Sequence, residues 1–317
     1  MSFICKGFLY RSLCMKFSSL THRLFIFILA ISITTLTHTA FDQIEKKPAH
    51  ALRVMTYNIR RDGKESAEER KWSQRLPHVS RIISEIDPDI IGLQEAQQNQ
   101  IDDLAPKDSK YKAFGKGRGT SWGGKGKDEH CPVFYNEDSL SLLEHGTFSI
   151  NPDFHKVSFF TWAKDYLGAG KIGRLPRICT YGRFKHKKTK REFYLYNTHL
   201  DDKSHSARLN TLETIKKHID ERDDNLPVII TGDFNTQLTD DIKQILSGFM
   251  PVKNMAQKTF GPKETRTGWD DNELKVIDHI LISESANAEV KQYGVIQSEK
   301  PYPSDHRPVI ADIVLGA

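Results

Sequence analysis

The sequence is poor in cysteine and has no hydrophobic run long enough to cross a bilayer as a helix. Its longest largely apolar run, residues 24–36, has thirteen residues, whereas a spanning helix needs roughly 20. The sequence contains neither an HExxH motif nor paired cysteine spacings, which argues against a zinc site. No internal repeat or low-complexity tract is present, so the chain is not a repeat protein.

Negative charge is missing from the first 40 residues, and this explains most of the net charge. The formal charge of the whole chain is +5. Four of these positive charges lie before position 41, where no Asp or Glu occurs, which leaves +1 for the rest. A chain so nearly balanced shows no general preference for nucleic acid. The four early residues are Lys6, Arg11, Lys16 and Arg23.

Residues 1–40 have the features of an export signal. Lys16 and Arg23 precede the apolar run, and small residues follow it, which is the usual order in a signal peptide. Cleavage after Ala40 or after Ala51 fits this pattern. We therefore expect a signal peptide at 1–40 and a secreted or periplasmic protein, with a permanent membrane anchor as the alternative.

The remainder divides into a polar linker, residues 41–51, and one domain, residues 52–317, a size that a single two-sheet enzyme can reach. Two cysteines, Cys131 and Cys179, lie in strand-like segments of this domain. Isolated cysteines in such segments are usually buried free thiols. A disulfide between them, which an oxidising compartment would allow, is the less favoured alternative.

From residue 52 onward the chain alternates between strand-like and helix-like segments, which predicts an α/β fold. Apolar spacing typical of one helix face predicts helices, and short apolar runs bounded by turn residues predict strands. A glycine-rich basic stretch, 114–127, lacks the strand–loop–helix context of a phosphate-binding loop and is interpreted as a surface loop. The expected helices are 72–86 and 207–220, and the expected strands include 90–93, 132–135, 177–184, 192–197 and 228–231.

Acidic, amide and imidazole side chains occur where the strand-like runs stop. Hard oxygen donors together with two histidines, held at rigid strand ends, suit one divalent cation and a phosphate ester. The runs are LRVMTYN58, DIIGLQE95, LYNTH199, VIITGD233FN235, KVID278 and SD305H306.

These motifs, in this order over about residues 52–315, resemble those of the endonuclease/exonuclease/phosphatase superfamily, the deoxyribonuclease-I-like hydrolases. The runs LPRICTY and NTHLDD are similar to LPRICTW and NTHFDH of a bacterial secreted branch. The resemblance implies that residues 52–317 form the catalytic domain. It also implies a four-layer sandwich in which two packed mixed β-sheets are flanked by helices.

The resemblance further implies a metal site and a water-activating pair. Asn58, Glu95 and Asp305 match the metal motifs, with Mg²⁺ expected and Mn²⁺ as an alternative. Asp233 would hold or deprotonate the attacking water. Asn235 would orient that water or bind a phosphoryl oxygen.

Two carboxylate–imidazole pairs complete the implied catalytic set. Alignment with the family pattern pairs Glu129 with His199 and Asp278 with His306. A carboxylate fixes the tautomer of an imidazole and raises its basicity. Which histidine protonates the leaving oxygen and which stabilises the phosphoryl charge is left open.

Three further residues are candidates for substrate contacts. Arg177 could grip a phosphate with two donors, or form a salt bridge to a motif carboxylate. Asp201 would face the same side as His199 if the strand continued. Trp269 could stack on a base, a sugar or a lipid-facing group, or simply anchor its loop.

The function implied is a secreted, magnesium-dependent phosphoesterase that hydrolyses phosphodiester bonds by in-line attack of water, with a nuclease as its most ordinary form. The alternatives are a phospholipid or sphingomyelin phosphodiesterase and a small-molecule phosphatase. A non-enzymatic binding protein is disfavoured because the motif residues are all present. The expected partner is a phosphate-ester substrate, which could be nucleic acid. The chain is expected to be a monomer without an obligate protein partner.

Overall fold

The computed structural model describes residues 40–119, 128–150 and 175–316. By its internal contacts the chain divides into two units, 1–39 and 40–317, and all the described residues belong to the second. The predicted signal peptide therefore lies outside the described residues, apart from Ala40. None of the helices that the structure describes is both long and apolar enough to cross a membrane.

The domain contains two mixed β-sheets. The first has seven strands, in the order β10 (Ala256–Phe260), β12 (Glu289–Val295), β13 (Val309–Val314), β1 (Leu52–Asn58), β2 (Ile90–Gln94), β4 (Val133–Asn136) and β3 (Tyr111–Phe114). The second has six, in the order β5 (Leu140–Ser149), β6 (Ile178–His186), β7 (Glu192–His199), β8 (Val228–Asp233), β11 (Asp278–Ser283) and β9 (Phe249–Pro251). The pairs β1–β2, β10–β12 and β7–β8 are parallel, and the other pairs are antiparallel.

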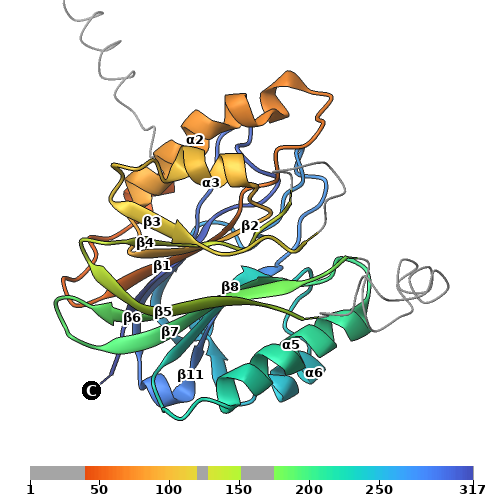
Figure 1. The fold of residues 1–317 in the computed structure, drawn as a ribbon. Helices are drawn as coiled ribbons and strands as arrows, with labels where there is room; N and C mark the ends of the chain where they lie inside the picture. The colour runs from red at the N-terminus through yellow and green to blue at the C-terminus, as the bar shows by residue number, and fades with distance from the viewer. Residues whose placement is uncertain (1–39, 120–127, 151–174, 317) are drawn as a thin grey trace, which may run out of the picture. The chain divides into compact units, whose positions relative to one another are not determined.

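Helices cover the outer face of each sheet, so the domain has four layers (Figure 1). The predicted sandwich of two packed mixed sheets flanked by helices is thus confirmed. Helices α2 (Trp72–Ile86) and α3 (Gln98–Leu104) lie on the first sheet, and α5 (His205–Asp220) and α6 (Asp240–Ile245) lie on the second. Shorter helices are η1 (Ala40–Gln43), η2 (Glu68–Arg70), α7 (Val252–Met255) and η4 (Glu284–Ala286).

Burial on both faces explains why the central strands are nearly continuous apolar runs. In β1, Val54 packs in the cluster between the sheets, whereas Met55 and Tyr57 pack against α2. The helix α2 has the predicted bounds and is followed by the C-cap residue Asp87, whose φ of 49° is left-handed. The helix α5 begins two residues earlier than predicted because the Ser204 side chain accepts the Ala207 N–H and caps it.

Two of the catalytic motifs lie at the start of a strand, whereas the sequence predicted that they end one. The strand β11 begins at Asp278 rather than ending there, and Asp305 and His306 precede β13. Because β11 runs antiparallel to β8, its start lies beside the end of β8, and Asp278 is paired in register with Asp233. The start of an antiparallel strand therefore brings its side chain to the same edge as the end of its neighbour.

A buried layer of amides joins the two sheets just inside this edge. Asn197 of β7 donates from Nδ2 to the carbonyls of Leu93 (2.7 Å) and Pro132 (3.0 Å) in the first sheet. Its Oδ1 accepts from Gln94 Nε2 (2.8 Å) and the Thr231 hydroxyl (3.2 Å). Gly92 is required at this close approach, since an added Cβ would lie 2.5 Å from Asn197 Oδ1.

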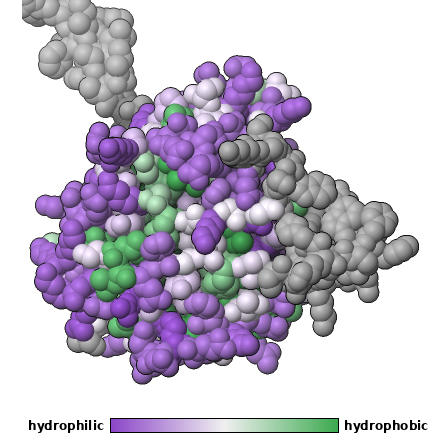
Figure 2. All heavy atoms as spheres, in the orientation of Figure 1, coloured by the Kyte–Doolittle hydropathy of each residue, from purple (hydrophilic) through white to green (hydrophobic). Residues whose placement is uncertain are grey.

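The face seen in Figure 2 is mostly hydrophilic, with hydrophobic residues in small separate areas. Among the described residues the exposed large hydrophobic side chains are Leu143, Met250 and Leu274.

Cys131 and Cys179 are buried free thiols, as the sequence indicated.

Replacing Asn197 by Ala should strongly destabilise the fold. The change removes the Asn197 donor from the buried Leu93 carbonyl, whereas the Pro132 carbonyl keeps the Leu93 N–H at 3.1 Å. A buried polar group left unsatisfied costs about 1–3 kcal/mol, and we expect the free energy of unfolding from urea denaturation to fall by about that amount. The exposed Asn225→Ala change serves as a control, and equal losses in the two variants would contradict this account.

Candidate active site at the shared edge of the sheets

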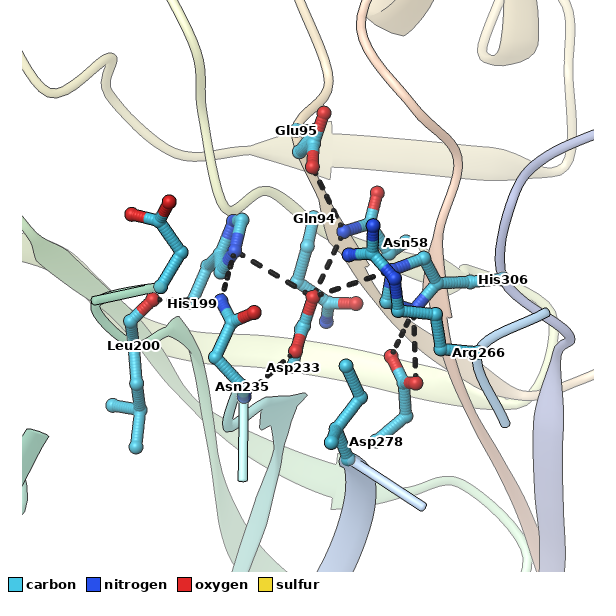
Figure 3. A network of polar contacts seen from close by, with 12 residues as sticks. Asn58, Gln94, Glu95, His199, Leu200, Asp233, Asn235, Arg266, Asp278 and His306 are labelled. Atoms are coloured by element: carbon cyan, nitrogen blue, oxygen red, sulfur yellow. Dashed lines mark hydrogen bonds and ion pairs between the residues drawn. The ribbon is translucent and has the colours of Figure 1, made fainter. Parts of the chain in front are cut away.

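The polar side chains predicted from the strand ends meet at one edge, between the two sheets (Figure 3). Asn58 ends β1 and Glu95 follows β2 in the first sheet, while Asp233 ends β8 in the second. The Asn58 amide Nδ2 donates to Glu95 Oε1 (3.1 Å) and to Asp233 Oδ2 (3.0 Å). Two carboxylates from different sheets therefore share one amide group.

His306 lies between two carboxylates of the second sheet. Its Nδ1 is 2.9 Å from Asp278 Oδ2, and its Nε2 is 3.6 Å from Asp233 Oδ2. The expected contact between Asp278 and His306 is thus present. Burial opposes protonation of His306, but the two aspartates outweigh it and raise the pKa of His306 to about 10. The imidazole is therefore a cation at neutral pH.

Asp233 is a buried carboxylate that lies within 4 Å of both histidines, 3.5 Å from His199 Nε2 and 3.6 Å from His306 Nε2. Burial, followed by the charge of Asp278, raises the pKa of Asp233 to about 7 despite the opposing charge of His306. Its Oδ1 accepts the Asn235 N–H at 2.8 Å. At neutral pH Asp233 can therefore both hold and release a proton, as a general base requires.

His199 is held in the neutral form. Burial, with the positive charge of Arg177 nearby, sets the pKa of His199 well below its ordinary value. Its Nε2 accepts from Asn235 Nδ2 (2.9 Å) and lies 3.5 Å from Asp233 Oδ2. The second amide hydrogen of Asn235 is donated to the Leu200 carbonyl (3.0 Å), so Asn235 orients His199 rather than turning freely.

The predicted pairing of Glu129 with His199 is wrong. Glu129 Oε1 instead contacts Arg118 Nη2 at 2.7 Å and Arg61 Nη1 at 3.2 Å. Two guanidinium groups hold the carboxylate more strongly than one neutral imidazole could. Burial raises the pKa of Glu129 even so, with Arg118 opposing that rise.

Glu95 is held ionised by its neighbours. Burial opposes its ionisation, but the Arg60 guanidinium, the Asn58 hydrogen bond and the cationic His306 outweigh it, and the pKa of Glu95 is lowered. Its backbone has a φ of +62°, and that of Asn235 is +54°. Such left-handed conformations are uncommon outside glycine and concentrate at functional sites.

The oxygen donors on the first-sheet side fit a hard divalent cation. Asp305 is 4% exposed, and its Oδ1 is buried without a hydrogen-bond partner among the described residues. The Asn58 amide presents nitrogen to Glu95, while its Oδ1 accepts the Arg60 N–H at 3.0 Å. Asn58 could therefore ligate a cation by oxygen only after its amide turned.

A second group of ligand-type atoms belongs to Asp233, Asp278 and His306, which lie within 4.8 Å of one another. The Asp278–His306 hydrogen bond already occupies two of these groups. This trio is better suited to holding and moving a proton than to an ion, because a bound cation would remove the reason for the high pKa of His306.

One buried arginine holds the two loops that carry the cation-facing residues. Arg75 of α2 is 1% exposed, and each hydrogen bond that its guanidinium makes in the described structure goes to a backbone carbonyl. It donates to Ile59, Pro303, Arg60, Arg61 and Arg70, at 2.6–3.2 Å. The loop after Asn58 and the loop before Asp305 are thereby fixed to the same helix.

Of the arginines near the site, the sequence singled out Arg177 but not Arg118 or Arg266. Arg118 lies in the glycine-rich stretch 114–127 interpreted as a surface loop, of which 120–127 lie outside the described residues. Its side chain is 8% exposed and faces Glu129. Arg266 Nη2 lies 3.7 Å from Asp305 Oδ2. A basic residue in a loop has no periodic pattern, so only the fold shows where its side chain points.

Two of the three predicted substrate-contacting residues have structural partners. Arg177 Nη2 lies 3.4 Å from Asp202 Oδ1 and 3.8 Å from Asp201 Oδ2, which is the salt bridge considered as an alternative. Asp201 Oδ1 accepts the N–H groups of Lys203 (2.9 Å) and Ser204 (2.7 Å), so Asp201 shapes the turn into α5. Arg177 also lines a small pocket with Glu95, Arg118, Glu129 and His199.

Trp269 is half-buried in the loop between β10 and β11. The guanidinium of Arg70 lies 5.3 Å from its ring centroid, and that of Arg75 lies 5.9 Å away. These contacts agree with the loop-anchoring alternative. They leave its predicted role in substrate binding as a prediction.

Comparison with solved structures finds bacterial proteins of the same architecture. The mannosyl-6-phosphatase Bt3783 of Bacteroides thetaiotaomicron VPI-5482 is 30% identical, with a TM-score of 0.70, over 83% of this chain and 100% of that one. An endonuclease/exonuclease/phosphatase family protein from Bacteroides thetaiotaomicron is also 30% identical, with a TM-score of 0.72, over 84% of this chain and 96% of that one.

Two curated proteins match more distantly. The CCR4-Not complex 3'-5'-exoribonuclease subunit Ccr4 of Kluyveromyces lactis is 24% identical over 214 residues, which cover 60% of this chain and 27% of Ccr4. Protein angel of Drosophila melanogaster is 24% identical over 174 residues, which cover 52% of this chain and 44% of that protein. This chain therefore matches less than half the length of either relative.

The family model described as Endonuclease/Exonuclease/phosphatase family matches residues 55–306, a range that contains every residue of the polar cluster at the sheet edge. The match spans most of the chain and agrees with the two bacterial structures of 30% identity. The chain therefore belongs to the endonuclease/exonuclease/phosphatase family, whose members are hydrolases that act on phosphate esters.

Proposed function

We propose that this protein is a divalent-metal-dependent phosphoesterase, with Mg²⁺ as its preferred ion, and that water attacks the phosphorus in line with the leaving oxygen. The observation that carries the proposal is the contrast in charge among three neighbouring groups. At neutral pH Glu95 is ionised, His306 is a cation, and Asp233 has a pKa of about 7. This contrast suits a reaction that develops negative charge on phosphoryl oxygens.

Glu95 and Asp305 would hold the cation, with Asn58 joining them once its amide oxygen faces the site. When bound, the ion supplies positive charge to the phosphoryl oxygens and orients the phosphate. Support for the site comes from the ionised Glu95 and from the unpartnered, buried Asp305 Oδ1. The all-oxygen donor set favours Mg²⁺ or Mn²⁺ over zinc.

Asp233 would accept the proton of the attacking water, since its raised pKa makes it basic enough near neutrality. His306 would remain protonated and bind a phosphoryl oxygen through Nε2, the nitrogen that Asp278 does not contact. His199, neutral and oriented by Asn235, would bind the phosphoryl group from the opposite side. It becomes the acid for the leaving oxygen only after taking up a proton.

For the substrate, a small phosphorylated molecule such as a sugar phosphate has the stronger support. The mannosyl-6-phosphatase matches over its full length at 30% identity. The nuclease expected from the sequence remains the second candidate, favoured by the match to the exoribonuclease subunit Ccr4.

We also propose export through the N-terminal signal.

The replacement Glu95→Gln should abolish the metal site while preserving the fold. Removing the ionised carboxylate weakens charge stabilisation in the transition state, and we expect kcat/KM to fall by about 100-fold or more. Mn²⁺ affinity measured by calorimetry should fall in parallel. The exposed Glu137→Gln variant is the control, and unchanged Mn²⁺ binding in the Glu95 variant would place the ion elsewhere.

The replacement Asp278→Asn should move the pH profile of kcat/KM to lower pH. Asp278 raises the pKa of both Asp233 and His306, so neutralising it lowers both values. The rising limb follows ionisation of Asp233 and the falling limb follows loss of the His306 proton, so both limbs shift in the same direction. The exposed Asp270→Asn variant is the control, and the limbs of its pH profile should not move. Limbs that also stay in place in Asp278→Asn would contradict these assignments.

Substrate class can be decided by a panel assayed with Mg²⁺ and with a chelator. We expect release of inorganic phosphate from mannose 6-phosphate to exceed cleavage of an RNA oligonucleotide and of sphingomyelin, and to stop when the chelator is added. Metal-dependent shortening of the oligonucleotide without phosphate release from sugars would instead establish the nuclease.

A further inference from the structure

A second concave site lies beside the catalytic centre and takes no part in the proposed mechanism. Its cavity of about 360 Å³ is bordered by the loop after β8, by α6 and α7, and by the segment that leads into β11. Small-molecule sites usually have volumes of about 300–1,000 Å³, so the cavity can hold a sugar phosphate or a nucleotide. We name it the lysine pocket, after Lys243, Lys253, Lys263 and Lys275, which line it.

The positive charge of the lysine pocket is largely uncompensated. Glu264 is the only acidic residue among the described residues that line it. Lys243 is paired with Asp240 at 2.9 Å, but no ion pair is recorded for Lys253, Lys263 or Lys275 in the described part of the chain. Like charges gathered around a hollow repel one another and create a field that attracts anions.

The wall between the lysines is apolar. Ile280 and Tyr293 are buried side chains that reach the cavity from the two sheets, and Leu274 stands at the rim with 52% of its surface exposed. His279 adds no charge, because burial lowers its pKa and outweighs the hydrogen bond from its Nε2 to the Thr236 carbonyl (3.0 Å), which raises it. A ligand that fits must combine a strongly anionic group with an apolar or ring-shaped body.

The pocket is connected to the catalytic centre through two short segments. Gln237 lines the pocket two residues after Asn235, and Lys275 lines it three residues before Asp278. The backbone of Lys275 pairs with that of Arg266 (3.0 and 3.1 Å), whose side chain approaches Asp305. Anything bound in the pocket would therefore contact the segments that position Asn235 and Asp278.

We propose that the lysine pocket is a second phosphate-binding site, for an organic phosphate of sugar-phosphate or nucleotide size. Lysine ammonium groups bind phosphate oxygens as point charges, and the apolar wall covers the ring of the ligand. The phosphate belongs either to the far end of a substrate held at Asp233 and His306 or to a separate effector molecule. The binding site itself does not depend on the proposed phosphoesterase activity.

The test uses phenylphosphonate, whose carbon–phosphorus bond a phosphoesterase does not hydrolyse, in calorimetric titrations of the full chain. Replacing Lys253, Lys263 and Lys275 together by Gln should weaken one class of site by about tenfold or more, since the charge-assisted contacts to the phosphate are lost. Methylphosphonate, which lacks the ring, should bind the pocket more weakly. The Glu95→Gln variant should retain this binding, which separates the inference from failure of the catalytic proposal.

A matched triple variant, with Lys46, Lys107 and Lys188 replaced by Gln, removes the same charge from exposed lysines outside the pocket. Unchanged phenylphosphonate binding in the pocket variant, or an equal loss in this control, would overturn the proposal. Kinetics on a hydrolysed substrate then identify the source of the phosphate. If KM rises and kcat is unchanged in the pocket variant, the phosphate belongs to the far end of the substrate. If phenylphosphonate inhibits the unmodified protein non-competitively and this inhibition is lost in the pocket variant, the phosphate belongs to an effector.

Discussion

The buried amide layer between the sheets is the constraint on which the site depends. Asn197 belongs to the second sheet but hydrogen-bonds Leu93, Pro132 and Gln94 of the first. Apolar side chains alone would let two twisted sheets slide by small amounts, whereas directional hydrogen bonds in a dry interior allow one spacing. Glu95 and Asp233 stand one or two residues beyond this layer, so their separation is set by it.

The meeting of side chains from both sheets at one edge also explains why two buried carboxylates of the site differ in pKa. Asn58 sits between an ionised Glu95 and an Asp233 whose pKa is about 7, although both are buried carboxylates. The difference comes from their neighbours: Arg60 favours the charge on Glu95, whereas Asp278 opposes the charge on Asp233. One amide thus marks the boundary between an anionic half of the site, suited to a cation, and a half that can exchange protons.

Much of this arrangement could be predicted from the sequence because it is carried by local patterns. Apolar runs that end on Asn58, Glu95 and Asp233 specify both the strands and what stands at their ends. The direction of approach of Asp278 could not be predicted, because an antiparallel strand start and a parallel strand end look alike in one sequence.

The contacts that individual loop side chains make could not be predicted from the sequence either. Glu129 was assigned to His199 by alignment, yet the contacts that hold it come from Arg61 and Arg118, which no periodicity identifies. Asp201 lay next to a catalytic motif, but its position before α5 made it a helix-entry residue. The partner of a loop side chain is decided by packing of distant segments, and spacing along the chain does not record it.

The account rests on one cation and one phosphoryl group sharing the edge between the sheets. Its most direct test is anomalous diffraction from crystals of the domain grown with Mn²⁺ and phosphate. The account predicts one strong manganese peak within about 2.5 Å of a Glu95 carboxylate oxygen, with phosphorus lying between that ion and His306. Manganese bound elsewhere, while Glu95 contacts Asn58 and Arg60 but no ion, would contradict it.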